Sequence, residues 1–289
     1  MSQEKINVVV AGATGYVGLD LVYYLSKHPK VNILSLCAQK NLGKDIQFFD
    51  KRIIKKLPKI SNLSKVKWAN VNLLFLSLPN GEAQKLVKSL FNYKHLKFID
   101  LSADFRIENV NSYKKWYSTK HKAKNLINES IYSIPEFTKK NIKNFRIISN
   151  PGCYPTSIQL ALVPLIKKAL IETDNITIDS KSGYSGAGKK YKSKFSHKNI
   201  NNSVFAYGIE KHKHMSELDQ QLKKVSKSKL EYNFIPHLLP TFRGILSTMY
   251  IETKKNINIE KVYNELKNFH LRNSFIKLLK INTPIGSGN

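Results

Sequence analysis

The sequence predicts an α/β fold, a Rossmann-type doubly wound parallel sheet followed by an α+β domain. Two observations predict it. A continuous apolar run at residues 5–11 leads directly into a glycine turn and a helical pattern, as at the start of many parallel sheets. Later apolar runs alternate with helical patterns up to residue 149, which is typical of parallel strands joined by helices. The pattern changes after Asn150, and we therefore expect two domains, 1–150 and 151–289.

Local spacing predicts each element of the first domain. Apolar side chains from Tyr16 to Leu25 recur at helical spacing, and this helix is expected to end near Pro29. A β-rich run at 31–37 completes a strand–helix–strand unit. Three later apolar runs are expected to be strands, with one helix among them: strands at 71–78, 96–101 and 145–149, and the helix at 82–91.

The second half begins with a break at Pro151-Gly152, followed by a helical stretch at 154–170. A loop rich in glycine and lysine at 182–189 is longer than a structural connection needs, and we interpret it as a functional loop. Strands are expected at 176–180, 230–236 and 244–252. Helices and strands of this half are therefore mixed as in an α+β domain.

Composition excludes several classes of protein. With 42% hydrophobic residues among 289, the chain is too apolar to be disordered and long enough for two domains. It has neither a run of roughly 18 apolar residues nor a signal-peptide pattern, so membrane spanning and secretion are not expected. The two cysteines, Cys37 and Cys153, are too few and too far apart for a disulfide scaffold or a zinc site, and no metal is expected. A reducing cytoplasm fits this composition best.

The formal net charge is +28, from 48 basic residues against 20 acidic ones. Such a charge would suit a polyanion such as nucleic acid. However, arginine, which reads bases and phosphates through paired hydrogen bonds, is rare, and lysine is spread along the whole chain. We therefore expect a solvated lysine surface and no nucleic-acid or membrane partner; a steep salt dependence of binding would favour the polyanion alternative.

The turn after the first strand carries glycines at positions 12, 15 and 18. Such glycines let the backbone bend tightly and approach a pyrophosphate, while the following helix directs its first N–H groups at the phosphates. The spacing is G-x-x-G-x-x-G and not G-x-G-x-x-G, and a glycine turn can also be purely structural. Its position directly after the first apolar strand favours a dinucleotide site.

The end of the second strand indicates which dinucleotide is expected. A site that prefers NAD usually places Asp or Glu about 20 residues after the glycines, on the ribose 2′-hydroxyl. Residues 35–40 contain no carboxylate, and Lys40 and Lys44 are nearby in the sequence. This segment suits a ribose 2′-phosphate better than a free 2′-hydroxyl, and NADP is therefore the expected cofactor.

The sharpest motif is SNPGCYPT at 149–156, which places Cys153 at the start of a predicted helix directly after a strand. A helix N-terminus favours the thiolate and supplies N–H donors to an oxyanion, two requirements of covalent catalysis. A lone cysteine is more often a small buried hydrophobe, and Cys37, inside a strand, is expected to be one. The flanking glycine and prolines favour a nucleophile at Cys153.

A thiolate nucleophile needs a proton partner, and residues 212–217 (HKHMSE) offer two histidines and a carboxylate. If a helix begins here, His214 and Glu217 share one face, and the carboxylate can orient the imidazole. A solvated polar turn is the alternative for an isolated His-x-His, but a poised cysteine disfavours it. Five other histidines lie among lysines or at element ends and are expected at the surface: His28, His95, His121, His197 and His270.

Taken in order, these motifs resemble those of the N-acetyl-γ-glutamyl-phosphate reductase family, within the aspartate-semialdehyde dehydrogenase superfamily. The resemblance covers nearly the whole chain, and the cysteine motif is its most specific part. It extends through the glycine turn at 12–18, LSADFR at 101–106, the cysteine motif, the loop at 182–189, HKHMSE at 212–217 and PHLLPTFRG at 236–244.

The resemblance implies an enzyme of arginine biosynthesis that reduces an acyl phosphate with NADPH and forms a homo-oligomer, a dimer or tetramer, with its second domain catalytic and dimerising. It implies that Cys153 is the nucleophile and that His214 is the acid/base, oriented by Glu217. Substrate ligands are expected at Arg106, Asn150 and Arg243. Cofactor ligands are expected at Gly12, Thr14, Gly15, Tyr16, Val17, Lys40, Ser77, Pro79, Gly186, Ala187 and Gly188.

Departures from the family pattern leave alternatives open. Family members continue beyond the counterpart of Asn289 with a segment that returns to the nucleotide domain, so we expect the 289-residue chain to be less stable and less active than a longer form. Ser157 replaces the usual Gly or Ala, and Met215-Ser216 replaces a Thr-Pro or Gln-Pro pair. The alternatives are the same chemistry on an aminoadipate- or aspartate-type acyl phosphate, and an inactive nucleotide-binding remnant.

Overall fold

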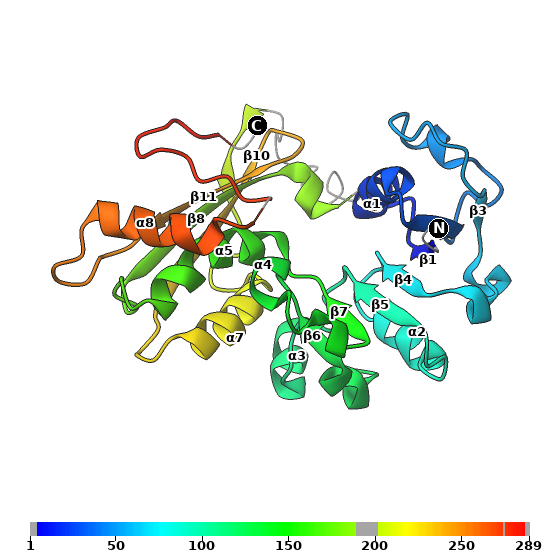
Figure 1. The fold of residues 1–289 in the computed structure, drawn as a ribbon, viewed down its shortest axis with the longest axis horizontal. Coiled ribbons are helices and arrows are strands. Elements are labelled where there is room, and N and C mark those ends of the chain that lie inside the picture. Colours follow the sequence, from blue (N-terminus) through cyan, green and yellow to red (C-terminus); the bar gives the residue numbers. More distant parts are fainter. Residues whose placement is uncertain (1–4, 189–201, 274, 287–289) are drawn as a thin grey trace. The chain divides into compact units, whose positions relative to one another are not determined.

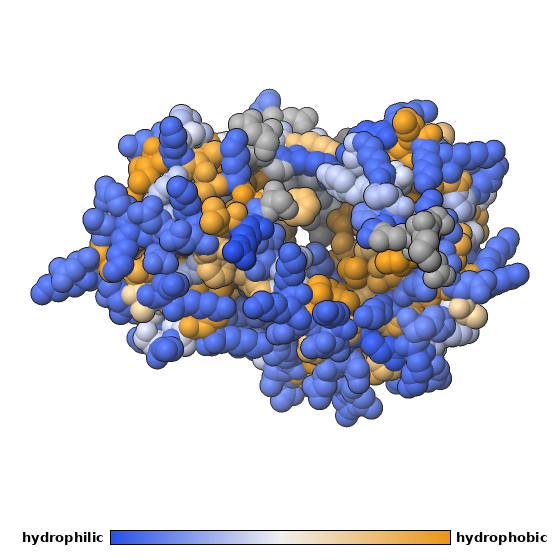
Figure 2. Space-filling view, in the orientation of Figure 1, coloured by the Kyte–Doolittle hydropathy of each residue, from blue (hydrophilic) through white to orange (hydrophobic). Residues whose placement is uncertain are grey.

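The computed structural model describes residues 5–188, 202–273 and 275–286. The chain divides into two compact units, Met1–Pro151 and Gly152–Asn289, and each unit has its own sheet (Figure 1). The face drawn in Figure 2 is largely hydrophilic, in keeping with a lysine-rich surface. No helix in the described ranges is long and apolar enough to cross a membrane.

The first unit is built on a seven-stranded sheet in which every pairing is parallel. The strand order is β3-β2-β1-β4-β5-β7-β6, so the order reverses beside β1, where ligands bind in doubly wound sheets. The predicted α/β class is thereby confirmed. The strands are β1 (Ile6–Ala11), β2 (Val31–Cys37), β3 (Ile60–Ser61), β4 (Leu73–Leu76), β5 (Lys97–Asp100), β6 (Ser130–Tyr132) and β7 (Ile147–Ser149).

Alternate residues of β1 are buried in two different apolar clusters. Val9 belongs to a cluster that includes Val87 of α2, whereas Val8 belongs to one that includes Val22 of α1. Because successive side chains of a strand point to opposite faces, both faces of the sheet are covered. The helices of this unit are α1 (Tyr16–Lys27), α2 (Glu82–Leu90), α3 (Val110–Tyr117) and α4 (Pro135–Thr138).

The second unit has a mixed four-stranded sheet in the order β11-β8-β10-β9. β8 and β10 are parallel, while β11 and β9 pair antiparallel with β8 and β10 respectively. Helix α5 packs against α7, α8 and β11, which confirms an α+β arrangement. The elements are α5 (Cys153–Lys167), β8 (Ile176–Gly183), β9 (Phe205–Ala206), α7 (Met215–Val225), β10 (Tyr232–Leu239), β11 (Ile245–Tyr250) and α8 (Ile259–His270).

The expected functional loop begins later than predicted. Strand β8 continues through Ser182 and Gly183, and a short 3-10 turn follows at Tyr184–Ala187. The longer strand arises because β8 pairs with β10 and β11 as far as these residues. Lys189, at the end of the predicted loop, lies outside the described residues.

The expectation of surface histidines is wrong at two positions. His121 and His270 are buried, and their Nε2 atoms lie 2.8 Å from the carbonyl oxygens of Asp104 and Leu160 respectively. The sequence around His121 gave no sign of this burial, because Lys120 and Lys122 on either side of it are exposed. His270 is the last residue of α8. His197 lies outside the described residues.

Candidate active site and its surroundings

Cys153 is the first residue of α5 and is exposed, and neither cysteine of the chain is in a disulfide. Gly152 is the N-cap of this helix. The first turn of an α-helix presents N–H groups and a partial positive charge, which favour a thiolate and an oxyanion. Cys37, by contrast, is buried in β2, and burial raises the pKa of its thiol.

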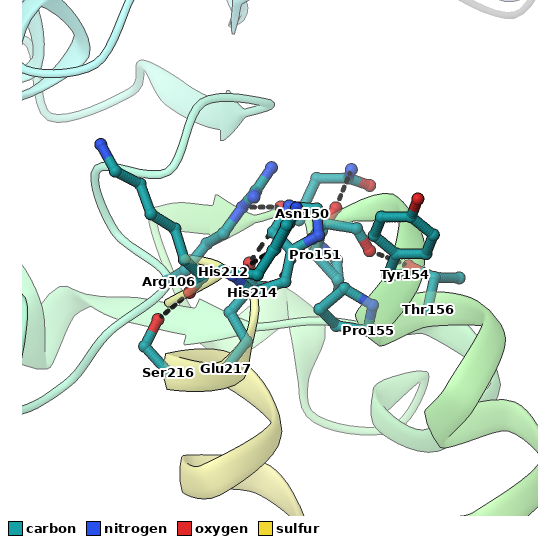
Figure 3. A network of polar contacts seen from close by, with 12 residues as sticks. Arg106, Asn150, Pro151, Tyr154, Pro155, Thr156, His212, His214, Ser216 and Glu217 are labelled. Atoms are coloured by element: carbon teal, nitrogen blue, oxygen red, sulfur yellow. Dashed lines mark hydrogen bonds and ion pairs between the residues drawn. The ribbon is translucent and has the colours of Figure 1, made fainter. Parts of the chain in front are cut away.

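His214 and Glu217 meet the start of α5 from the beginning of α7 (Figure 3). The fully buried Glu217 accepts a hydrogen bond through Oε2 from the backbone N–H of Gly152, at 2.8 Å. Its other oxygen, Oε1, lies 4.0 Å from Nε2 of His214. One carboxylate therefore contacts both the imidazole and the residue before Cys153.

Gly152 is a glycine because His214 and Glu217 leave no room for a side chain. A Cβ built on Gly152 would lie 2.5 Å from Nε2 of His214 and 2.8 Å from Oε1 of Glu217. The backbone conformation of Gly152 is not the reason, because its φ of −67° and ψ of 158° are values that any residue adopts. The imidazole therefore packs directly on the main chain beside the thiol-bearing residue.

The sequence-based expectation for residues 212–217 agrees with this geometry. His214 is the N-cap of α7, and Glu217 lies three residues later in its first turn. An acidic side chain there is favoured by the positive end of the helix. The structure thus brings Cys153, His214 and Glu217 to one place within the second unit.

The glycine turn of the first unit is tightly packed at two of its glycines and open at the third. Packing requires glycine at positions 12 and 18. A Cβ on Gly12 (φ +82°) would lie 2.0 Å from Ser77 O, and a Cβ on Gly18 would lie 2.2 Å from Gly12 O. Gly15, the N-cap of α1, has no such demand, since the nearest atom to a Cβ would be Gly12 O at 3.4 Å. Its missing side chain keeps the positive end of α1 open, which suits a phosphate group.

The other expected cofactor residues of the first unit flank this turn. The N–H groups of Gly12 and Ala13 donate to Cys37 O at 2.9 and 3.1 Å, which fastens the turn to the end of β2. Lys40 is exposed in the loop that follows β2. Thr14 directly precedes Gly15, Tyr16 and Val17 begin α1, Ser77 lies against Gly12, and Pro79 is exposed after β4.

In the second unit, the loop that contains Gly186, Ala187 and Gly188 is fastened to the segment that carries Arg243. Tyr184 N donates to Thr241 O and Ser185 N donates to Phe242 O, each at 2.9 Å. The Arg243 side chain is exposed, with its guanidinium 4.9 Å from the centre of the Phe242 ring. The structure therefore brings Arg243 and this loop together.

Arg106 supports main chain instead of pointing freely to solvent. Its side chain is buried, and Nε donates to Asn150 O at 2.8 Å (Figure 3). A terminal nitrogen of the same guanidinium donates to Leu101 O at 3.1 Å. Asn150 is exposed, and its side-chain amide donates to Pro151 O at 3.1 Å. Arg106 thus holds the backbone three residues before Cys153, and substrate binding by Arg106 and Asn150 stays a prediction.

Asp104, within LSADFR, has a structural role that sequence reasoning missed. It is fully buried and caps α2 by accepting hydrogen bonds from Gly81 N at 2.7 Å and Gln84 N at 3.0 Å. The Tyr113 hydroxyl also donates to it, at 3.2 Å. Asp104 therefore fixes the turn that follows Ser77 and Pro79. No local spacing could have indicated this, because Gly81 is 23 residues away.

Asp100, at the end of β5, holds the same motif from within. Its carboxyl group accepts hydrogen bonds from Ser102 N at 2.9 Å and from Phe105 N at 3.2 Å. Complete burial raises the pKa of Asp100 to about 6. The backbone that carries Asp104 and Arg106 is thus shaped by a carboxyl group that the solvent does not reach.

Both units match described protein families. Residues 7–145 match the family described as "Semialdehyde dehydrogenase, NAD binding domain", and residues 153–286 match "Semialdehyde dehydrogenase, dimerisation domain". Among solved structures, aspartate semialdehyde dehydrogenase II from Vibrio cholerae aligns with a TM-score of 0.69 at 18% identity, over 92% of this chain and 80% of that one. At that identity the likeness shows the fold.

Relatives with much higher identity extend over almost the whole chain. A protein of Brachyspira hyodysenteriae named "N-acetyl-gamma-glutamyl-phosphate reductase" is 40% identical over 96% of this chain and 80% of its own length. A rice protein named "Probable N-acetyl-gamma-glutamyl-phosphate reductase, chloroplastic" is 39% identical over 96% of this chain and 67% of its own length. These matches confirm the resemblance seen in the motifs. The chain belongs to the N-acetyl-γ-glutamyl-phosphate reductase family of oxidoreductases.

Proposed function

We propose that this protein reduces N-acetyl-γ-glutamyl phosphate to N-acetylglutamate semialdehyde, with NADPH and through a thioester on Cys153. The observation that carries the proposal is the exposed thiol at the N-terminus of α5, beside His214 and Glu217. The names of its relatives support the substrate and a role in arginine biosynthesis. A nicotinamide cofactor is supported by the family match of residues 7–145 and by the open N-terminus of α1 at Gly15.

The chemistry follows from what surrounds the thiol. Cys153 attacks the carbonyl carbon of the acyl phosphate, and phosphate leaves as the thioester forms. The positive end of α5 stabilises the thiolate and the oxyanion of the tetrahedral intermediate. NADPH, when bound, supplies the hydride that reduces the thioester to a hemithioacetal.

The histidine completes the reaction by moving a proton. As the hemithioacetal collapses to the aldehyde, its hydroxyl group loses a proton, the C–S bond breaks, and Nε2 of His214 protonates the departing sulfur. Glu217 keeps the imidazole beside the start of α5, because its two oxygens contact His214 and the Gly152 N–H. Substrate phosphate or carboxylate is proposed to meet Arg243, which is exposed on the loop that packs against residues 183–185.

Purified protein should oxidise NADPH when N-acetyl-γ-glutamyl phosphate is added, because thiol, acid/base and cofactor turn are all present. The measurement is the loss of absorbance of NADPH, with release of inorganic phosphate in equal amount. Aminoadipate- and aspartate-type acyl phosphates serve as matched controls and should react much more slowly. Faster reduction of either control would show that this control, and not N-acetyl-γ-glutamyl phosphate, is the substrate. NADPH binding without turnover of any acyl phosphate would indicate an inactive remnant.

NADPH should be preferred over NADH. Residues 35–40 contain no carboxylate that would repel a 2′-phosphate, and Lys40 lies in the loop after β2. The measurement is kcat/KM for each cofactor at a fixed concentration of acyl phosphate. Lys40→Glu should reverse much of the preference, whereas Lys30→Glu, on the loop before β2, should leave it unchanged. Equal values for the two cofactors in the unaltered protein would contradict the argument.

Self-association is also proposed, through the second unit. The family matched by residues 153–286 is described as a dimerisation domain. The sheet of this unit has one face buried and one partly exposed, as the alternation along β8 shows. A partly exposed sheet face is a suitable surface for a second copy. A cytoplasmic location stays a prediction.

A further inference from the structure

His212 lies in a ring of aromatic side chains next to the proposed acid/base. Its imidazole is half-buried, and a Cβ on Gly208 would touch it at 3.4 Å. The neighbouring rings meet it edge-on, with centroid distances of 5.5 Å for Tyr154, 5.5 Å for Tyr207, 5.6 Å for Phe234 and 4.8 Å for His214. Contacts on so many sides fix the position of this imidazole.

One hydrogen bond connects this ring to the main chain of His214. The backbone N–H of His214 donates to Nδ1 of His212, at 3.2 Å. Because a backbone N–H can only donate, Nδ1 must carry a lone pair, and the ring is the neutral tautomer with its proton on Nε2. The carbonyl group of His212 in turn accepts from Met215 N at 2.9 Å. His212 therefore shapes the turn from which α7 begins.

The environment keeps this ring neutral. Burial lowers the pKa of His212 to about 4, and the adjacent His214 acts in the same direction. Protonation would remove the acceptor at Nδ1 and place a positive charge beside the His214 ring. The hydrogen bond to His214 N is thus present throughout the pH range in which an enzyme of this kind would work.

The position of His212 affects the surroundings of Cys153 through Tyr154 and through the His214 ring. Tyr154 is the residue after Cys153. The centroid of its ring lies 5.5 Å from that of His212 and 5.8 Å from that of His214. The His214 ring packs closely on the start of α5, since Nε2 lies 2.5 Å from the position that a Cβ on Gly152 would occupy. A small error in the backbone at His214 would therefore move Nε2 relative to the thiol.

We propose that His212 is a positioning residue whose Nδ1 holds the main chain of His214 and so aims the His214 imidazole at the start of α5. The proposal rests on the proposed acid/base function of His214. It gives the two histidines of HKHMSE different tasks: His214 moves the proton, and His212 sets where it does so.

Three variants separate the acceptor from the shape of the ring. His212→Asn can place its amide oxygen where Nδ1 lies, His212→Gln places its oxygen one bond farther along the side chain, and His212→Phe keeps a planar ring without an acceptor. We expect kcat within about threefold of the unaltered protein for the Asn variant. For the Gln and Phe variants kcat should fall about 10- to 100-fold, the size of a loss caused by misplacing a catalytic group, while KM for NADPH stays unchanged.

A second readout does not depend on the substrate. The rate of alkylation of Cys153 by iodoacetamide, followed against pH, reports the interaction of the thiol with His214; the buried Cys37 adds little to it. The Asn variant should reproduce the pH profile of the unaltered protein, whereas the Gln and Phe variants should shift it. If no acyl phosphate is reduced, the proposed function fails, but this profile still tests the proposal on His212.

The dependence of the melting temperature on pH should also report that the His212 ring is neutral in the folded protein. The unfolded chain binds a proton at His212 near pH 6.5, and the folded chain binds it only near pH 4, so this residue lowers the stability as the pH falls through that window. The Asn variant, which does not titrate, should lose less melting temperature between pH 6.5 and 4. Equal kcat losses in the Asn and Gln variants, or an unaltered kcat and alkylation profile in Gln and Phe, would overturn the proposal.

Discussion

Cys153→Ser is expected to abolish reduction of the acyl phosphate while leaving the protein folded. Serine differs from cysteine by one atom, but its hydroxyl group does not ionise near neutral pH and is a poor nucleophile even at the positive end of α5. We expect kcat to fall by about a thousandfold or more. The measurement is phosphate release and NADPH oxidation, together with a thermal melt and an NADPH titration that should both match the unaltered protein.

Cys37→Ser is the matched control for this variant. Cys37 is buried in β2, with its Sγ 3.4 Å from the hydroxyl oxygen of Ser35, so a serine there would find a partner at the expense of apolar packing. The melting temperature should fall slightly and kcat should stay unchanged. A Cys153→Ser variant that kept most of the rate, or a Cys37→Ser variant that lost it, would show that the nucleophile is assigned to the wrong residue.

Gly152→Ala should impair catalysis strongly, although it adds only a single methyl group. The backbone at Gly152 suits alanine, so the whole effect comes from a Cβ that would lie 2.5 Å from Nε2 of His214 and 2.8 Å from Oε1 of Glu217. The imidazole or the carboxylate must move, and the contact between them is lost. We expect kcat to fall about 100-fold, with a smaller change in KM, because a displaced acid/base costs the reaction more than it costs binding.

Gly286→Ala is its control, because a Cβ at Gly286 has no atom within 4 Å. Both variants have the same change in composition, and both lie in the second unit. Steady-state kinetics and the pH dependence of kcat/KM should be altered only by the change at Gly152. If Gly152→Ala were as active as the control, His214 would not need its place against α5, and its proposed function would fail.

Much of the fold could be predicted because its strongest signals are local. The helix from Tyr16 and the strand at 31–37 agree with α1 and β2 almost residue for residue. The two-residue strand β3 and the three-residue strand β6 were missed, since such short strands have too few residues to show alternation. Their positions depend on pairing with β2 and β7.

The site was predictable to the extent that its residues lie close together in the sequence. His214 and Glu217 could be paired through the helical spacing that joins them. The reason for Gly152 could not be found in this way, because the side chains that exclude a Cβ there lie more than 60 residues along the chain. The same holds for Asp104, whose main-chain partners belong to another element.

The boundary between the two units falls inside the nucleophile motif, and this limits how such proteins can be recombined. In the first unit Arg106 holds Asn150 O, in the second Glu217 holds Gly152 N, and only Pro151 separates these two anchored residues. Junctions between domains usually accept cuts, insertions and the exchange of one domain for another. Here a chimera joined between Pro151 and Gly152 keeps each anchored residue with its own partner, whereas a junction a few residues to either side takes Asn150 and Arg106, or Gly152 and Glu217, from different parents.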